Sequence, residues 1–167
     1  MKNEIVIVMG VSGSGKTTVA EELAGTYQAK FIDADDLHPR GNIEKMSQKI
    51  SLDDNDRQPW LERVADAVYS LQSRNLSAFI ACSALKKKYR DQIRAGNAGL
   101  RFLFLDGTYS AILNRMNSRA GHFMSSAMLQ SQFDTLERPD GEPDVLTINA
   151  DEPIDRIVDQ ARILLAR

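Results

Sequence analysis

The chain has 167 residues, 43% of them hydrophobic and 26% charged, as in an ordinary globular protein, and this length predicts a single domain, residues 1–167. The net charge of −2 argues against a nucleic-acid binder with a broad basic face, so any anion site has to be local. No apolar run reaches the roughly 18 residues of a membrane span, and Cys82 is the single cysteine. Because residues 1–4 lead directly into a predicted strand, we expect no signal peptide. We therefore expect a cytoplasmic protein without disulfides that binds neither nucleic acid nor membrane.

A glycine-rich loop follows the first predicted strand, 5–9. It matches the pattern G-x-x-x-x-G-K-[ST] from Gly10 to Thr17, and apolar residues recur at helical spacing after it. Glycines let the backbone N–H groups turn inward, and with the helix N-terminus these groups form an anion nest. A plain glycine-rich turn would not require Lys16 and Thr17, which suit the β- and γ-phosphates of ATP and Mg²⁺ respectively. The residues expected to hold ATP here are Gly10, Val11, Ser12, Gly13, Ser14, Gly15, Lys16, Thr17 and Thr18.

Two carboxylates stand at the end of the second predicted strand. Asp33 and Asp35 occupy alternate positions, which share a face of a strand, at the edge where open α/β sheets handle substrate and metal. The third predicted strand ends in Cys82 instead of the aspartate with which P-loop NTPases usually help to hold Mg²⁺. We therefore expect Asp33 to hold Mg²⁺ through a water molecule and Asp35 to be the catalytic base. The alternative for such a segment is an acidic turn with a helix cap, and this is the role we expect for Asp36, as the cap of the next helix.

The substrate side of the site is expected in residues 39–60. A short helix covers 42–49, and Pro59 suits the first turn of a long helix after it, with the preceding aspartates meeting the helix dipole. Arg57 is interpreted as an anion- or hydroxyl-binding residue at the rim, and Trp60 as a packing residue.

Basic residues recur at intervals of four along the chain. Lys86, Arg90 and Arg94 fall on one face of a helix, and the first two, nearer the strand end, are expected to contact substrate, whereas Arg94 equally suits a solvated basic face. Arg115 and Arg119 lie near the end of a later helix. They suit the helix dipole, and they also suit a lid, about 115–130, that closes over the ATP phosphates.

Strands and helices alternate throughout the sequence. This alternation predicts an α/β fold with a parallel, doubly wound sheet covered by helices on both faces. The predicted strands are 5–9, 29–32, 76–82, 100–105 and 144–150.

With these segments placed, the chain resembles the gluconokinases, small P-loop kinases related to shikimate and adenylate kinases. The resemblance covers nearly the whole length. It rests on the P-loop together with Asp35-Asp36-Leu37-His38-Pro39, Asn42-Ile43-Glu44-Lys45-Met46, Asp56-Arg57-Gln58-Pro59-Trp60-Leu61, Cys82-Ser83-Ala84-Leu85-Lys86, Tyr89-Arg90-Asp91, Gly121-His122-Phe123-Met124, Ser131-Gln132-Phe133 and Leu136-Glu137.

The resemblance implies a three-layer P-loop NTPase fold with a small helical lid, and transfer of the ATP γ-phosphoryl group to the 6-hydroxyl of D-gluconate with Mg²⁺. It also implies a homodimer. Asp35 would deprotonate the hydroxyl, while Lys16, Arg115 and Arg119 would stabilise the transferring group. The donors expected for the sugar acid are His38, Lys45, Arg57, Lys86, Arg90 and His122. Another small-molecule or nucleotide kinase is the nearest alternative, and a P-loop switch a more remote one.

Overall fold

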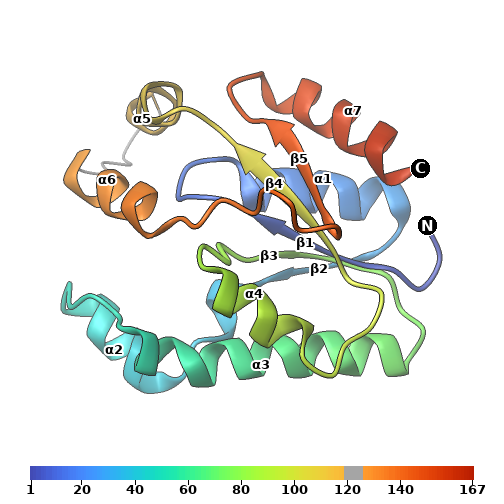
Figure 1. Cartoon of the computed structure of the whole chain (residues 1–167), viewed down its shortest axis with the longest axis horizontal. Helices are drawn as coiled ribbons and strands as arrows, with labels where there is room; N and C mark the ends of the chain where they lie inside the picture. The colour runs from blue at the N-terminus through green and yellow to red at the C-terminus, as the bar shows by residue number, and fades with distance from the viewer. Residues whose placement is uncertain (119–125) are drawn as a thin grey trace.

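A five-stranded parallel sheet forms the centre of the computed structural model, which describes residues 1–118 and 126–167 (Figure 1). The strand order is β2-β3-β1-β4-β5, so the chain crosses over between neighbouring strands, as the predicted doubly wound topology requires. The strands are β1 (Ile5–Met9), β2 (Lys30–Asp33), β3 (Ala78–Ala81), β4 (Arg101–Asp106) and β5 (Val145–Asn149).

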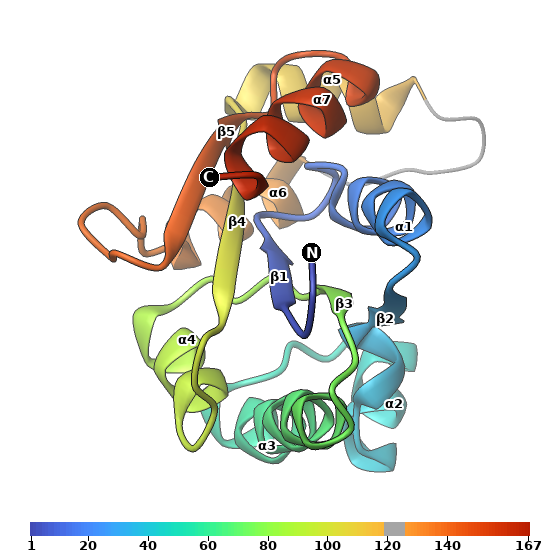
Figure 2. The ribbon, with the colours of Figure 1, turned by 90° about the vertical axis from the view of Figure 1, so that its right-hand side faces the viewer.

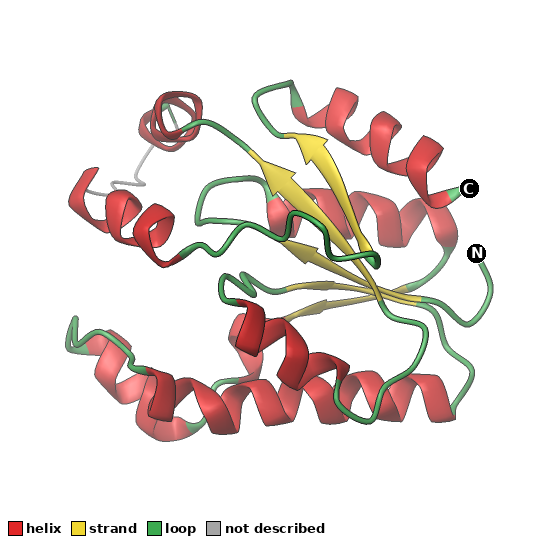
Figure 3. Cartoon of the chain, viewed as in Figure 1, coloured by secondary structure: helices red, strands yellow, loops and turns green. Residues whose placement is uncertain are grey.

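Helices cover both faces of this sheet, which makes three layers and confirms the predicted fold class (Figures 2 and 3). On one face lie α1 (Lys16–Tyr27) and α7 (Ile154–Leu165), and on the other α3 (Asp54–Ser73) and α4 (Lys87–Arg94). Four short helices gather at the end to which the strands point (Figure 3). These are η1 (Ala34–Leu37), α2 (Arg40–Ser47), α5 (Tyr109–Asn117) and α6 (Ser126–Thr135). No helix among the described residues is long and apolar enough to cross a membrane.

The central strand β1 explains why helices are needed on both faces. All five of its residues are buried, and because side chains alternate along a strand, Ile5, Ile7 and Met9 pack with α3 and α4 while Val6 and Val8 pack with α1 and α7. A strand that is apolar on both sides can only be the inner strand of a covered sheet, and its carboxyl end therefore opens at the edge of the core.

Two local predictions about helix starts are wrong. The long helix α3 begins at Asp54, five residues before Pro59, because Asp53 and Asp56 form a capping box in which each side chain accepts the other's backbone N–H, at 2.8 and 3.0 Å. This box satisfies N–H groups that would otherwise be unpaired at the helix start. Asp36 caps no helix, since Asp33 caps η1 and Pro39 precedes α2.

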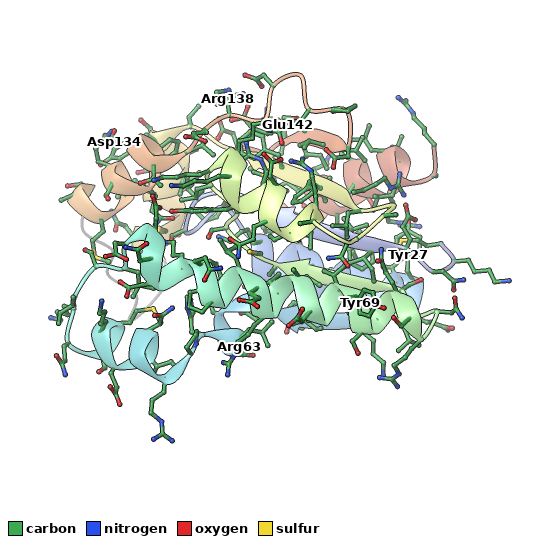
Figure 4. All side chains as sticks on the ribbon, turned by 60° about the horizontal axis from the view of Figure 1, so that its bottom comes forward. Tyr27, Arg63, Tyr69, Asp134, Arg138 and Glu142 are labelled. Carbon is green, nitrogen blue, oxygen red and sulfur yellow. The ribbon has the colours of Figure 1, made fainter. Side chains whose placement is uncertain are left out.

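A buried ion-pair network holds α4 against the segment that leads into β5. The side chain of Arg90 is fully buried, and its guanidinium donates to the carboxylate of Glu142 at 2.7–3.2 Å and to the carbonyls of Ala84, Leu85 and Glu137. Figure 4 shows Glu142 beside α4. Every donor direction of this guanidinium is occupied by protein, so Arg90 is a structural residue.

We predict that Glu142→Ala destabilises the fold by about 3–5 kcal/mol, because it leaves the Arg90 charge buried without its counter-ion. The measurement is urea unfolding followed by circular dichroism. The control is Asp159→Ala, which removes an exposed pair with Arg162 and should cost less than about 1 kcal/mol. Equal effects of the two variants would contradict the structural importance of the network.

Candidate active site

The loop after β1 has the backbone conformation of an anion nest. Gly13 and Gly15 have φ angles of 79° and 98°, in the left-handed region that favours glycine. A Cβ atom would also overlap the Met116 side chain at the first position and lie 2.8 Å from Ile154 Cδ1 at the second. Ser14 is fully buried between them, and its Oγ has no partner among the described residues. The loop therefore contains a buried hydroxyl group that the described residues leave without a hydrogen-bond partner.

Lys16 begins α1 and brings a positive charge to this loop, in a half-buried position. Its Nζ donates to the carbonyl of Val11 at 3.0 Å. Burial lowers the pKa of Lys16, and the nearby negative charge of Asp35, followed by that of Asp33, opposes this effect. An entering anion would therefore find an ammonium group that is partly shielded from solvent.

Asp33 and Asp35 lie together at the carboxyl end of β2, as predicted, although not as alternate residues of one strand. Asp33 ends β2, whereas Asp35 lies in η1 and donates its backbone N–H to Asp33 Oδ1 at 2.9 Å. Burial raises the pKa of Asp35, and the charge of Asp33 raises it further. A carboxyl group with a raised pKa is more basic, which suits a group that accepts a proton.

Cys82 stands where many P-loop enzymes carry a further aspartate, after β3. It is buried, and this burial raises the pKa of its thiol to about 12. The group is therefore neutral at physiological pH and is no ligand for a hard cation. The carboxylates that face the P-loop come from the end of β2 instead.

One pocket of about 380 Å³ joins the P-loop to these carboxylates. Its lining includes predicted residues from four segments: the P-loop, the end of β2, the turn after η1 and the start of α3. The predicted residues in it are Ser12, Gly13, Lys16, Thr17, Asp33, Asp35, His38 and Arg57. Within the described residues, no group of three His, Cys, Asp or Glu side chains could hold a metal ion alone. Mg²⁺ is compatible with this arrangement, because it usually keeps waters and binds one or two protein ligands plus phosphates.

The pocket also contains residues that sequence reasoning did not single out for the site. Trp60 stacks on the His38 ring with 4.4 Å between centroids and 15° between planes, and it donates Nε1–H to the Ala34 carbonyl at 2.7 Å. The packing role predicted for it is therefore observed, but in the wall of the pocket. Gln132 of α6 accepts from the Ser12 backbone N–H and Oγ at 3.3 Å. The remaining such lining residues are Met46, Leu52, Ala81 and Ser83.

Three predicted substrate donors do not line this pocket. Lys45 pairs with Asp56 at 2.7 Å and Lys86 with Asp54 at 3.2 Å, each at the protein surface, while Arg90 is buried in the network described above. Each of these three cations is paired with an acidic residue that lies 11 to 52 residues away in the sequence. The prediction that Arg90 contacts substrate is therefore corrected by its burial.

Arg115 lies against the outer side of the P-loop. Its guanidinium donates to the carbonyl of Ser14 at 3.1 Å and to those of Ala150 and Glu152 at 2.6 and 3.0 Å. It therefore links α5, the P-loop and the segment between β5 and α7. The two other predicted residues, Arg119 and His122, lie outside the described residues.

The parallel sheet, the P-loop with its lysine and the facing carboxylates define the class of the protein: a P-loop kinase. A family model described as an AAA domain matches residues 5–139. An APS kinase from Mycobacterium tuberculosis superposes with a TM-score of 0.72 over 99% of both chains, and at 19% identity this likeness concerns the fold alone.

Closer relatives identify the family. The chain is 54% identical to the thermosensitive gluconokinase of Escherichia coli K12, over 97% of this chain and 87% of that protein, and 47% identical to the thermoresistant gluconokinase of the same organism, over 93% and 90%. The crystal structure of a gluconokinase from Sinorhizobium meliloti 1021 has a TM-score of 0.91 at 43% identity and covers 99% of this chain and 93% of its own. The chain belongs to the gluconokinase family.

Proposed function

We propose that this protein transfers the γ-phosphoryl group of ATP to the 6-hydroxyl of D-gluconate, giving 6-phospho-D-gluconate and ADP. The observation that carries this proposal is the pocket in which a P-loop and two carboxylates face each other, in a chain 54% identical to a gluconokinase. Phosphoryl transfer requires mainly positioning and charge stabilisation, and the pocket offers groups for both.

The nucleotide is bound by the loop of residues 10–18. Its backbone N–H groups and the start of α1 surround the phosphates, while Lys16 turns from the Val11 carbonyl to the β- and γ-phosphates. Thr17 would ligate Mg²⁺ directly and Asp33 would hold one of its waters. When bound, Mg²⁺ would supply positive charge that offsets the charge of the phosphates.

The acceptor lies on the other side of the pocket, against residues 39–60. Asp35 accepts the proton of the 6-hydroxyl as that oxygen attacks the γ-phosphorus, and ADP leaves with the electron pair of the broken P–O bond. His38 and Arg57 supply hydrogen-bond donors for the hydroxyls and the carboxylate of the sugar acid. Lys45 and Lys86, each already paired, flank this side.

We also propose that residues 1–167 form one domain with a lid at about 115–130. Arg115, at its start, already contacts the P-loop through the Ser14 carbonyl, and a small movement of its side chain would bring it to a bound polyphosphate. Arg119 and His122 belong to the same segment in this proposal. Closure would exclude water, which competes with gluconate for the phosphoryl group.

The proposed reaction predicts that gluconate, and neither shikimate nor AMP, drives ADP release from ATP in a coupled assay. Lys16→Ala should abolish most of this activity, because the ammonium charge on the transferring phosphates is lost, and the variant should remain folded by circular dichroism. Addition of EDTA should stop the reaction, and excess Mg²⁺ should restore it. Turnover of another acceptor at a higher kcat/KM would overturn the substrate assignment.

We predict that Asp35→Asn lowers kcat by about 10²- to 10⁴-fold, because a base acts in the transition state. The KM for gluconate should change far less. The matched control is Asp36→Asn, since Asp36 is an exposed neighbour outside the pocket, and it should keep the activity of the parent. An Asp35→Asn variant in which only KM rises would make Asp35 a binding residue.

The homodimer implied by the family resemblance is a further proposal. Light scattering coupled to size-exclusion chromatography should give twice the mass of the 18.6 kDa chain at assay concentrations. A single species of chain mass would contradict it.

A further inference from the structure

A chain of hydrogen bonds runs from the start of α3 to the His38 ring. Asn42 of α2 is buried, and its Nδ2 lies 2.9 Å from the backbone carbonyl of Asp56 and 3.2 Å from His38 Nδ1. A backbone carbonyl can only accept a hydrogen bond, so the amide atom that faces it has to be the NH₂ group. The orientation of the Asn42 amide is thereby fixed by the backbone.

This orientation also fixes the protonation of the histidine ring. The NH₂ group has two hydrogens, and the second points to His38 Nδ1, which therefore carries a lone pair and no proton. A ring with a bare Nδ1 is neutral and has its single proton on Nε2. Burial, the largest effect, lowers the pKa of His38; among the facing charges, Asp35 raises the pKa and Arg57 lowers it.

The protonated nitrogen is the polar atom of the ring that remains for a ligand. His38 lines the pocket with Asp35, while Trp60 stacks on its face. The buried polar atoms without a partner in the described part of the chain are Ser14 Oγ, Asn97 Oδ1 and Arg101 Nε. His38 Nε2 is not among them and has no hydrogen bond within residues 1–118 and 126–167, so it is accessible from the pocket.

We propose that Asn42 is a positioning residue that holds His38 as the neutral Nε2–H tautomer, so that the ring donates a hydrogen bond to an oxygen of the sugar-acid substrate. This inference rests on the proposed function. It adds a reason for specificity: Asp35 accepts from one hydroxyl, while His38 donates to a neighbouring oxygen, a pattern that suits a polyhydroxy acid. If Nε2 carried no proton, its lone pair would instead face the lone pairs of that oxygen.

The tautomer is measured by ¹⁵N NMR of histidine-labelled protein, without substrate and independently of any activity. The sequence has two histidines, so His38→Gln assigns the signals by their loss. In the parent protein we expect protonated Nε2 and a bare Nδ1 at neutral pH. A protonated Nδ1 would overturn the proposal at once, whichever acceptor the enzyme phosphorylates.

Asn42→Asp removes the donor and places an acceptor at the same site. We expect His38 Nδ1 to become protonated. The KM for gluconate should rise about tenfold when it is assayed at a pH at which the spectrum shows a neutral ring, because the pocket loses one donor. The KM for ATP should not change. Unaltered ring signals in Asn42→Asp would contradict the proposal.

The matched control is Asn97→Asp, since Asn97 Nδ2 also donates to two partners, here the backbone carbonyls of Ala65 and Ile93, at a site outside the pocket. This variant should lose stability without altering the His38 signals or the KM for gluconate. If it raises the KM as much as Asn42→Asp does, the effect is a general loss of structure and the proposal fails.

Should Asn42→Asp not fold, Asn42→Ala should still change the tautomer ratio, and an unchanged ratio there would equally overturn the proposal.

Discussion

The attraction between the half-buried ammonium group of Lys16 and two carboxylates is the interaction on which the rest of the site depends. Lys16 lies at the start of α1, and the charges of Asp35 and Asp33, at the end of a strand two positions away in the sheet, raise its pKa against the effect of desolvation. Each side of this arrangement favours the charged form of the other, because an opposite charge nearby stabilises a partly desolvated ion. The P-loop and the end of β2 are therefore electrostatically coupled before any ligand binds.

This balance of charges also explains why a neutral side chain is favourable after β3. A third carboxylate in place of Cys82 would add repulsion against Asp33, Asp35 and the incoming phosphates, whereas a thiol with a pKa of about 12 adds none. The two aspartates that remain repel the phosphates of ATP unless a divalent cation lies between them. The charge distribution thus makes metal and nucleotide binding mutually dependent in the proposed mechanism.

The parts of the structure that the sequence predicts are those specified locally. The P-loop, the alternation of strands and helices and the acidic end of β2 follow from spacing within a few residues, and the structure contains all three. Lys86 and Arg90 are expected at the substrate because they follow closely on a strand end, and Lys45 because the family resemblance implies it. Their acidic partners lie far along the chain, and only the fold brings them close. Contrary to the prediction, Pro59 does not lie in the first turn of its helix. The helix begins earlier, because the capping box that Asp53 forms with Asp56 is the stronger start signal.

Arg90 does not line the pocket, but its ion pair with Glu142, 52 residues away in the sequence, affects the shape of the pocket. Arg90 and Glu142 hold α4 against the segment after α6, and the N–H of Glu137 donates to the Leu85 carbonyl at 2.8 Å in the same region. This junction places α6 so that Gln132 reaches the P-loop at Ser12. Because interiors are closely packed, a shift of the junction would be transmitted to the loop that holds the phosphates. A buried cation that does not line the pocket therefore contributes to the geometry of the site through the elements it fixes.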